Sequence, residues 1–198
     1  MARTRSRPMP KKKRSTDVAS ALLRIELSGI DPLIWRRIRV PTNLTLHKLH
    51  RVIQIAFSWQ DCHLHQFEVG ELRIGVPEAN EDDDALQDER KWKLTEVLKV
   101  GGGEFRYVYD FGDWWEHRVI AEPETRTDAG AGIAPLCLAG ENAAPPEDVG
   151  GIPGYELLRQ ALADPGHEQH AEMLEWIGGI WDAKGFDLNQ VNRALRGA

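Results

Sequence analysis

The sequence predicts a single α+β domain: a mostly antiparallel sheet, with a helix after the second strand and a C-terminal helical group. Strand patterns occur early in the chain and helical patterns at its end, which argues against a parallel α/β sheet. The length of 198 residues and the 41% of hydrophobic residues suit one domain with a substantial core. We expect this domain to cover residues 19–198, after a disordered basic tail at 1–18.

Hydrophobic residues at alternate positions, bounded by proline, glycine or aspartate, define the expected strands. These strands cover residues 22–28, 33–40, 63–69, 72–76, 105–110 and 114–121. Helical spacing of hydrophobic residues, with caps such as Thr45 and Asp187, defines the expected helices. These helices cover residues 46–57, 94–98, 154–163, 167–177 and 187–196. Residues 122–153, rich in proline, glycine and alanine, are expected to be irregular and either functional or mobile.

The charge is distributed unevenly along the chain. Residues 1–16 carry 7 basic residues and no acid, so the remainder holds 18 basic residues against 31 acidic ones. Such an acidic body repels nucleic acid, because affinity for phosphate depends on neutralising cations. Nucleic-acid binding is therefore expected only through the tail, which can equally be a solubilising extension.

The sequence also bears on the compartment. No hydrophobic run approaches the roughly 18 residues that span a bilayer, and the basic N-terminus lacks the hydrophobic stretch of a secretory signal. Cys62 and Cys137 lie far apart in the chain, which indicates free thiols in a reducing compartment. We therefore expect a cytoplasmic protein without a membrane partner.

One stretch, residues 107–117, holds the densest group of metal-binding and proton-transferring side chains. Asp110, Asp113 and His117 lie there around a glycine that favours a tight hairpin. His63 and His65 are two residues apart, so on a strand both imidazoles project from one face. Together these five residues are candidate ligands for zinc, manganese or iron.

The register of the hairpin decides whether Asp110 and His117 can cooperate. A two-residue turn at Gly112-Asp113, which Gly-x favours, would place both on the same face of the sheet. A three-residue turn would move His117 to the opposite face from Asp110, among the tyrosines of the preceding strand.

A purely structural interpretation competes with the metal site. Asp113 would cap the turn, Asp110 would pair with an arginine of the second strand, and His117 would hydrogen-bond within the sheet. Glu147 and Asp148 precede two glycines, so they suit either the N-terminus of the next helix or a general base.

Several motifs occur in a fixed order along the chain: Ile34-Trp35-Arg36-Arg37-Ile38, Phe57-x-Trp59, His63-Leu64-His65, Tyr109-Asp110-Phe-Gly112-Asp113-x-Trp115-x-His117 and Pro145-Pro146-Glu147-Asp148-x-Gly150-Gly151. Over about residues 20–196, this pattern resembles the plasmid pRiA4b ORF-3-like family. The resemblance implies a single α+β domain in a protein of bacterial plasmids, insertion sequences and chromosomes, but it implies no reaction. Some relatives have cysteine where this chain has Val149, which weakens a thiolate–metal site.

Three functions are consistent with these patterns. The first is a non-enzymatic binding or accessory protein, associated with mobile DNA, whose ligand is an unidentified protein or small molecule. The second is a metal-dependent hydrolase of phosphoester-type bonds, with Glu147 or Asp148 as general base at the predicted ligands. The third is DNA binding through residues 1–16. The hydrolase requires the predicted ligands to surround one open cleft.

Overall fold

The computed structural model describes residues 19–77, 85–123 and 134–197. The basic tail at 1–18 and the acidic run at 81–84 lie outside these ranges. The strands are β1 (Ser20–Leu27), β2 (Ile34–Pro41), β3 (His65–Val69), β4 (Leu72–Gly75), β5 (Gln87–Asp88), β6 (Glu104–Tyr109), β7 (Trp115–Glu122) and β8 (Leu136–Glu141). The helices are α1 (Leu46–Phe57), α2 (Leu94–Val100), α3 (Gly151–Ala163), α4 (His170–Trp176) and α5 (Leu188–Leu195).

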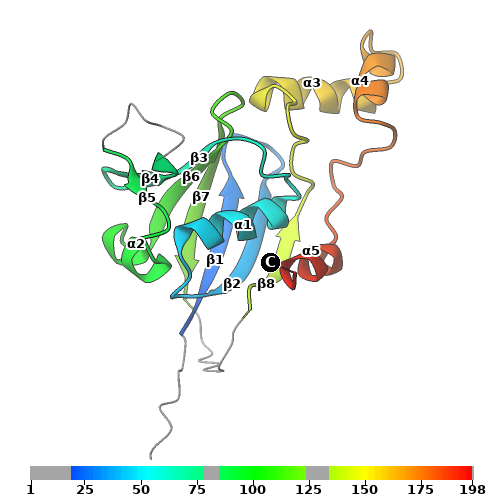
Figure 1. The fold of residues 1–198 in the computed structure, drawn as a ribbon. Helices are drawn as coiled ribbons and strands as arrows, with labels where there is room; N and C mark the ends of the chain where they lie inside the picture. The colour runs from blue at the N-terminus through cyan, green and yellow to red at the C-terminus, as the bar shows by residue number, and fades with distance from the viewer. Residues whose placement is uncertain (1–18, 78–84, 124–133, 198) are drawn as a thin grey trace, which may run out of the picture.

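All of these strands belong to one sheet with the order β5-β4-β3-β6-β7-β1-β2-β8. Neighbouring strands run antiparallel, apart from the short parallel pair β4–β5. Helix α1 lies across one face of this sheet, and α5 packs beside α1 and β8 (Figure 1). Helices α3 and α4 extend away from the sheet. The structure therefore confirms the predicted α+β class and the helix after the second strand.

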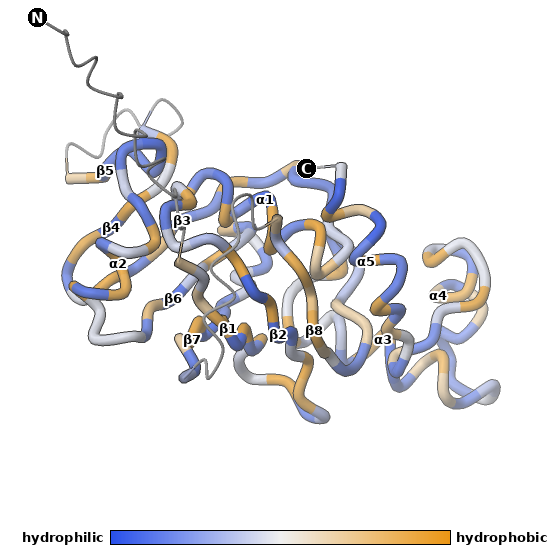
Figure 2. Tube along the Cα trace, turned by 90° about the horizontal axis from the view of Figure 1, so that it is seen from below, coloured by the Kyte–Doolittle hydropathy of each residue, from blue (hydrophilic) through white to orange (hydrophobic). Residues whose placement is uncertain are grey.

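One face of the sheet forms the core. Along β1, buried and half-buried residues alternate, and from Leu23 to Leu27 hydrophobic and charged residues alternate with them (Figure 2). The cross-strand pairs Tyr107↔His117 and His117↔Leu27 continue one buried row across three strands. The opposite face carries cross-strand ion pairs such as Arg106–Glu68 and Arg118–Glu104. Such alternation is typical of an antiparallel sheet with one solvated face.

Strand β8 was not predicted, because it lies inside the proline- and glycine-rich segment expected to be irregular. It forms the edge of the sheet and pairs with β2, with a register irregularity between Arg37 and Ile38. A Cβ on Gly140 of β8 would lie 2.7 Å from Phe186 and 2.8 Å from the Arg36 side chain. Glycine at this position therefore lets Phe186 stack on the Arg36 guanidinium, 4.3 Å from its ring centre.

The central hairpin has a different turn from the one that its Gly-x sequence favoured. Tyr109 pairs with Trp115 and Tyr107 with His117, so the expected two-residue turn is wrong. The strand register is that of the longer-turn alternative, which puts His117 on the face of the tyrosines. Asp110 and Trp114 at the two ends of the loop both adopt positive φ, at 56° and 57°, and the Trp114 amide donates to the Asp110 carbonyl at 2.6 Å. The Asp110 side chain holds this shape by accepting a hydrogen bond from the Gly112 amide at 2.8 Å.

In the three described ranges, no helix is both long and hydrophobic enough to span a bilayer. Cys62 is exposed and Cys137 is buried, and both thiols are free, as the sequence predicted.

Candidate metal centre

The candidate site forms at the sheet edge where β3 begins and β6 ends. His65 pairs with Tyr109 across these strands, so the residues just beyond them meet outside the ladder. The Asp110 amide donates to the Leu64 carbonyl at 2.8 Å, which continues the contact past the last strand pair. Pairing of β3 with β6 thus brings His63 beside Asp110, although 47 positions separate them in the sequence.

A second segment, the loop before α3, is attached to this edge by specific hydrogen bonds. The Trp59 indole N–H donates to the Pro145 carbonyl at 2.9 Å, and the Gln60 amide donates to Glu147 Oε1 at 2.8 Å. The Gly150 amide donates to Asp113 Oδ2 at 3.1 Å, which joins the loop to the hairpin. These bonds place Glu147 and the following aspartate beside His63.

Four side chains converge as a result, and we call His63, Asp110, Glu147 and Asp148 the His63 centre. The Nε2 atom of His63 lies 3.0 Å from Asp148 Oδ1, 3.7 Å from Asp110 Oδ2 and 3.8 Å from Glu147 Oε2. This Nε2 atom is buried, and none of the described residues forms a hydrogen bond with it. Around a metal whose bonds to its ligands are about 2.1 Å long, neighbouring ligand atoms lie roughly 3.0–3.5 Å apart. The 3.0 Å spacing of His63 and Asp148 lies within that range and also suits an ion pair, and the other two spacings are a few tenths of an ångström longer than the range.

Two of the carboxylates are oriented by hydrogen bonds to their other oxygen. Asp110 accepts from Gly112 through Oδ1, which leaves Oδ2 directed at His63. Glu147 accepts from the Gln60 amide through Oε1, which leaves Oε2 on the side of His63. The Tyr109 hydroxyl also donates to Glu147, at 3.1 Å from Oε1. Second partners of this kind fix the direction of metal ligands.

The protonation of Tyr109 supports that role. Burial, and then the hydrogen bond with the Cys62 thiol and the proximity of Glu147, raise the pKa of the Tyr109 phenol well above its ordinary value, although the bond from the Cys62 amide lowers it. The phenol therefore keeps its proton at neutral pH and remains a hydrogen-bond donor to the Glu147 carboxylate.

One side of the His63 centre is open. The Asp148 side chain is 71% exposed and the His63 side chain 27%, whereas those of Asp110 and Glu147 are 10% exposed. Asp110 and Asp148 both adopt positive φ, at 56° and 57°. Backbone conformations of this kind are retained where side chains must be aimed, and they concentrate at functional sites. Cys62 Sγ lies within ligand distance of His63 and Glu147 and adds a further donor at the open side.

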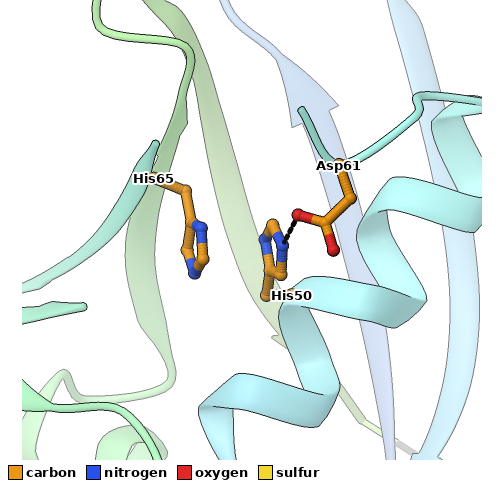
Figure 3. A group of neighbouring side chains, drawn as sticks. All are labelled: His50, Asp61 and His65. Carbon is orange, nitrogen blue, oxygen red and sulfur yellow. Dashed lines mark hydrogen bonds and ion pairs between the residues drawn. The ribbon is translucent and has the colours of Figure 1, made fainter. Parts of the chain in front are cut away.

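His65, a predicted ligand, faces a different group. Its Nε2 lies 2.7 Å from the fully buried Glu89, whose other oxygen lies 2.8 Å from His47 Nδ1. The His65 ring stacks on the buried His50 ring, with centres 3.4 Å apart and planes inclined by 5°. Asp61 lies at the edge of the His50 ring, 2.6 Å from Nε2, while His65 lies against its face (Figure 3).

His50, Asp61 and His65 are close enough together to suggest a second metal site. However, a metal lies in the plane of each imidazole that binds it, and two parallel rings 3.4 Å apart share no such point. His50 is instead satisfied by Asp61 at Nε2 and by the Tyr107 hydroxyl, 2.7 Å from Nδ1. We therefore interpret this group as a buried hydrogen-bond network.

The electrostatics of the network follow from its burial. Burial, and then the neighbouring His65, lower the pKa of His50 to about 4. Burial alone would raise the pKa of Glu89, but its hydrogen bonds to His65 and then His47 lower it below its ordinary value. His50 is thus neutral and Glu89 ionised at pH 7. The position of His50, four residues after Leu46, already places it beside the buried stripe of α1, which suits a packing histidine.

The other two predicted ligands are also apart from the His63 centre. His117 is fully buried, and its ring meets those of Phe57 and Trp59 edge to face at 4.8 and 5.2 Å. Burial lowers the pKa of His117 to about 3. Asp113 uses its carboxylate on the Gly150 amide, ahead of α3. Of the five predicted ligands, the fold therefore brings together only His63 and Asp110, and it adds both predicted acid–base residues to them.

Comparison with known proteins gives the chain its relatives. The family described as plasmid pRiA4b ORF-3-like protein matches residues 19–190. An uncharacterized protein of Sinorhizobium fredii, y4hQ, is 39% identical over 181 residues, which cover 90% of this chain and 92% of that protein. The crystal structure of MM3350, a protein of unknown function from Methanosarcina mazei Go1, aligns with a TM-score of 0.75 and 38% identity. The alignment covers 86% of this chain and 96% of MM3350. The match over nearly the whole described chain shows that this protein belongs to the plasmid pRiA4b ORF-3-like family.

Proposed function

We propose that this protein is a metal-dependent hydrolase that acts on a phosphoester-type bond at the His63 centre. One observation carries the proposal: the buried Nε2 of His63 faces three carboxylates at 3.0–3.8 Å without a hydrogen bond. One imidazole with carboxylate oxygens suits zinc, manganese or iron.

The residues divide into two roles. His63, Asp110 and Asp148 are the ligands, because one nitrogen or oxygen atom of each lies within 4.8 Å of the other two. Glu147 is the general base, because it lies beside this group without belonging to it, with Oε2 3.8 Å from His63 Nε2. A divalent metal held there would lower the pKa of a bound water, to near 7 in the case of zinc, and would polarise a phosphoryl oxygen.

The first test is elemental analysis of the full chain purified without an affinity tag. We expect near-stoichiometric zinc, manganese or iron in the wild type, and its loss in His63→Ala and in Asp110→Asn. His47→Ala is the matched control, because His47 contacts Glu89 and lies outside the His63 centre. No bound metal in the wild type after each ion has been added would remove the proposal and favour a non-enzymatic binding role.

The second test separates the base from the ligands. Glu147→Gln should keep the metal but lower kcat for bis(p-nitrophenyl) phosphate by about 10²–10⁴-fold, the usual contribution of a general base. Equal rates for this variant and the wild type would show that Glu147 takes no proton in the reaction.

A further inference from the structure

A pocket of about 570 Å³ lies beside the His63 centre and shares Glu147 with it. Its walls come from the end of α1, the loop before α3, the connection from α4 to α5, and α5 itself. Four aromatic side chains line it: Phe57, Trp59, Trp181 and Phe186. The volume is within the ~300–1,000 Å³ that small-molecule sites occupy.

The aromatic walls are fixed by contacts inside the protein. Trp59 donates its indole N–H to Pro145 and stacks on Phe57 and Tyr109, with ring centres 5.3 and 4.9 Å away. Trp181 meets Tyr155 edge to face at 5.9 Å. The pocket is thus formed before a ligand arrives. Phe57 and Trp59 are buried and stack on one another, so the partly buried rings of Trp181 and Phe186 are those that a flat group can contact at little cost in ordering.

The charged groups of the pocket wall are already used. The Arg36 guanidinium donates to four backbone carbonyls, at 2.8–2.9 Å, and has no acidic partner among the described residues. Asp187 accepts from the amides of Asn189 and Gln190 as the cap of α5. These charged groups already have hydrogen-bond partners, so an occupant that stacks on the aromatic walls need not supply one to Arg36 or Asp187. Gln60 and Gln190 line the same pocket and can orient a polar substituent.

We infer that this pocket binds an uncharged aromatic group of the substrate, so that the substrate is a phosphate ester of an aromatic alcohol. The inference rests on the proposed function for the position of the scissile bond. Hydrolysis then forms a bond from water oxygen to phosphorus and breaks the bond from phosphorus to the aryl oxygen. Glu147 takes one proton from the water and passes it to the departing aryl oxygen, which leaves as the alcohol, while the second proton of the water stays on the phosphate product.

Binding of 2-naphthol to the metal-free full chain, measured by equilibrium dialysis, tests the pocket without requiring activity. We expect saturable binding that weakens about 10-fold in Trp181→Ala, through loss of ring stacking, and recovers in Trp181→Phe. Two controls should bind as the wild type does. Trp176→Ala removes an exposed tryptophan of α4 outside the pocket. Arg159→Ala alters a second pocket that Trp181 also lines.

The outcomes are distinct. Absence of saturable binding in the wild type, or equal binding by Trp181→Ala and Trp176→Ala, overturns the inference. Weakening in Arg159→Ala as large as in Trp181→Ala assigns the probe to the second pocket and also overturns it. Binding that depends on Trp181, in a protein that takes up no metal, supports the aromatic site and removes the hydrolase. With metal present, Trp181→Ala should lower kcat/KM for 2-naphthyl phosphate about 10-fold and leave that for methyl phosphate unchanged.

Discussion

The buried imidazole of His117 is expected to make the fold sensitive to acid. Its ring meets those of Phe57 and Trp59 edge to face, its Nδ1 is 3.3 Å from the Tyr107 carbonyl, and its Nε2 has no partner in the described part of the chain. Protonation would place a charge beside the Arg36 guanidinium in an aromatic environment, with no carboxylate to receive it. The folded protein therefore holds His117 neutral, whereas the unfolded chain exposes it to water.

The size of the effect follows from the two pKa values. Burial lowers the pKa of His117 from an ordinary 6.5 to about 3 in the folded protein. Between these values the unfolded chain binds more protons, so the free energy of unfolding falls as pH drops below 6.5. At pH 4.5 the unfolded state gains about 3 kcal/mol from this one imidazole, relative to pH 7.5.

Urea unfolding at pH 7.5 and pH 4.5 measures this quantity for the wild type, His117→Phe and His117→Gln. Both variants remove the titration, so each should lose about 3 kcal/mol less than the wild type on acidification. Their stabilities at pH 7.5 will differ from one another, because phenylalanine and glutamine pack differently, but the part that depends on pH should agree. If both variants lose as much stability as the wild type, His117 is not a buried neutral imidazole and the reasoning fails.

Three further predictions concern the same core. Arg36→Met should lower the free energy of unfolding by about 3–5 kcal/mol, because four backbone carbonyls lose their donor; urea unfolding with an unchanged m-value would establish this. Gly151→Ala should lower the free energy of unfolding by about 1–3 kcal/mol, since φ is 67° and the new Cβ would lie 2.8 Å from the Asp113 carbonyl oxygen. Gly102→Ala, at φ 64° in open space, should lower it less, and equal shifts of the melting temperature in the two variants would contradict this. Glu89→Gln should lower the free energy of unfolding by about 2–3 kcal/mol at pH 7. Because the pKa of Glu89 is lowered in the folded protein, acid removes the contribution of this carboxylate, and the loss should shrink as pH falls. A loss that does not change between pH 7 and 4 would exclude ionisation of Glu89.

Much of the fold follows from local sequence patterns. The alternation in β1 and β2, and the helical spacing from Leu46 to Phe57, predict elements whose ends agree with the structure within two residues. Strand β8 carries little such signal, because the sequence Leu-Cys-Leu-Ala-Gly-Glu includes small residues and half of its residues are only partly buried. Its place is decided by pairing with β2, which the sequence of β8 alone does not encode.

The candidate site was predictable in its residue types but not in its grouping. His63 and His65 differ in environment because β3 begins at His65, so His63 lies in the preceding loop and the alternation of a strand does not apply to it. The hairpin register depends on positive φ at Asp110 and Trp114, residues whose types allow several turns. Glu147 reaches the site through contacts with residues about 38 and 87 positions away, and no local pattern reports contacts over such distances.

The loop that carries His63 is held in place by hydrogen bonds from several elements, and the buried network of His50 and His65 is one of its attachments. Three consecutive amides, those of residues 60, 61 and 62, donate to Glu147, Gln54 and Tyr109, at 2.8, 3.0 and 3.2 Å. The acceptors belong to a loop, a helix and a strand, so the segment cannot shift without breaking contacts with all three. Asp61 adds its bond to His50, which joins the loop to the stacked histidines. Ligands and bases work only when they are held within a fraction of an ångström of their working geometry. The network of His50 and His65 would then serve the His63 centre by keeping this loop in place, which explains why two buried histidines contribute to the site without reaching it.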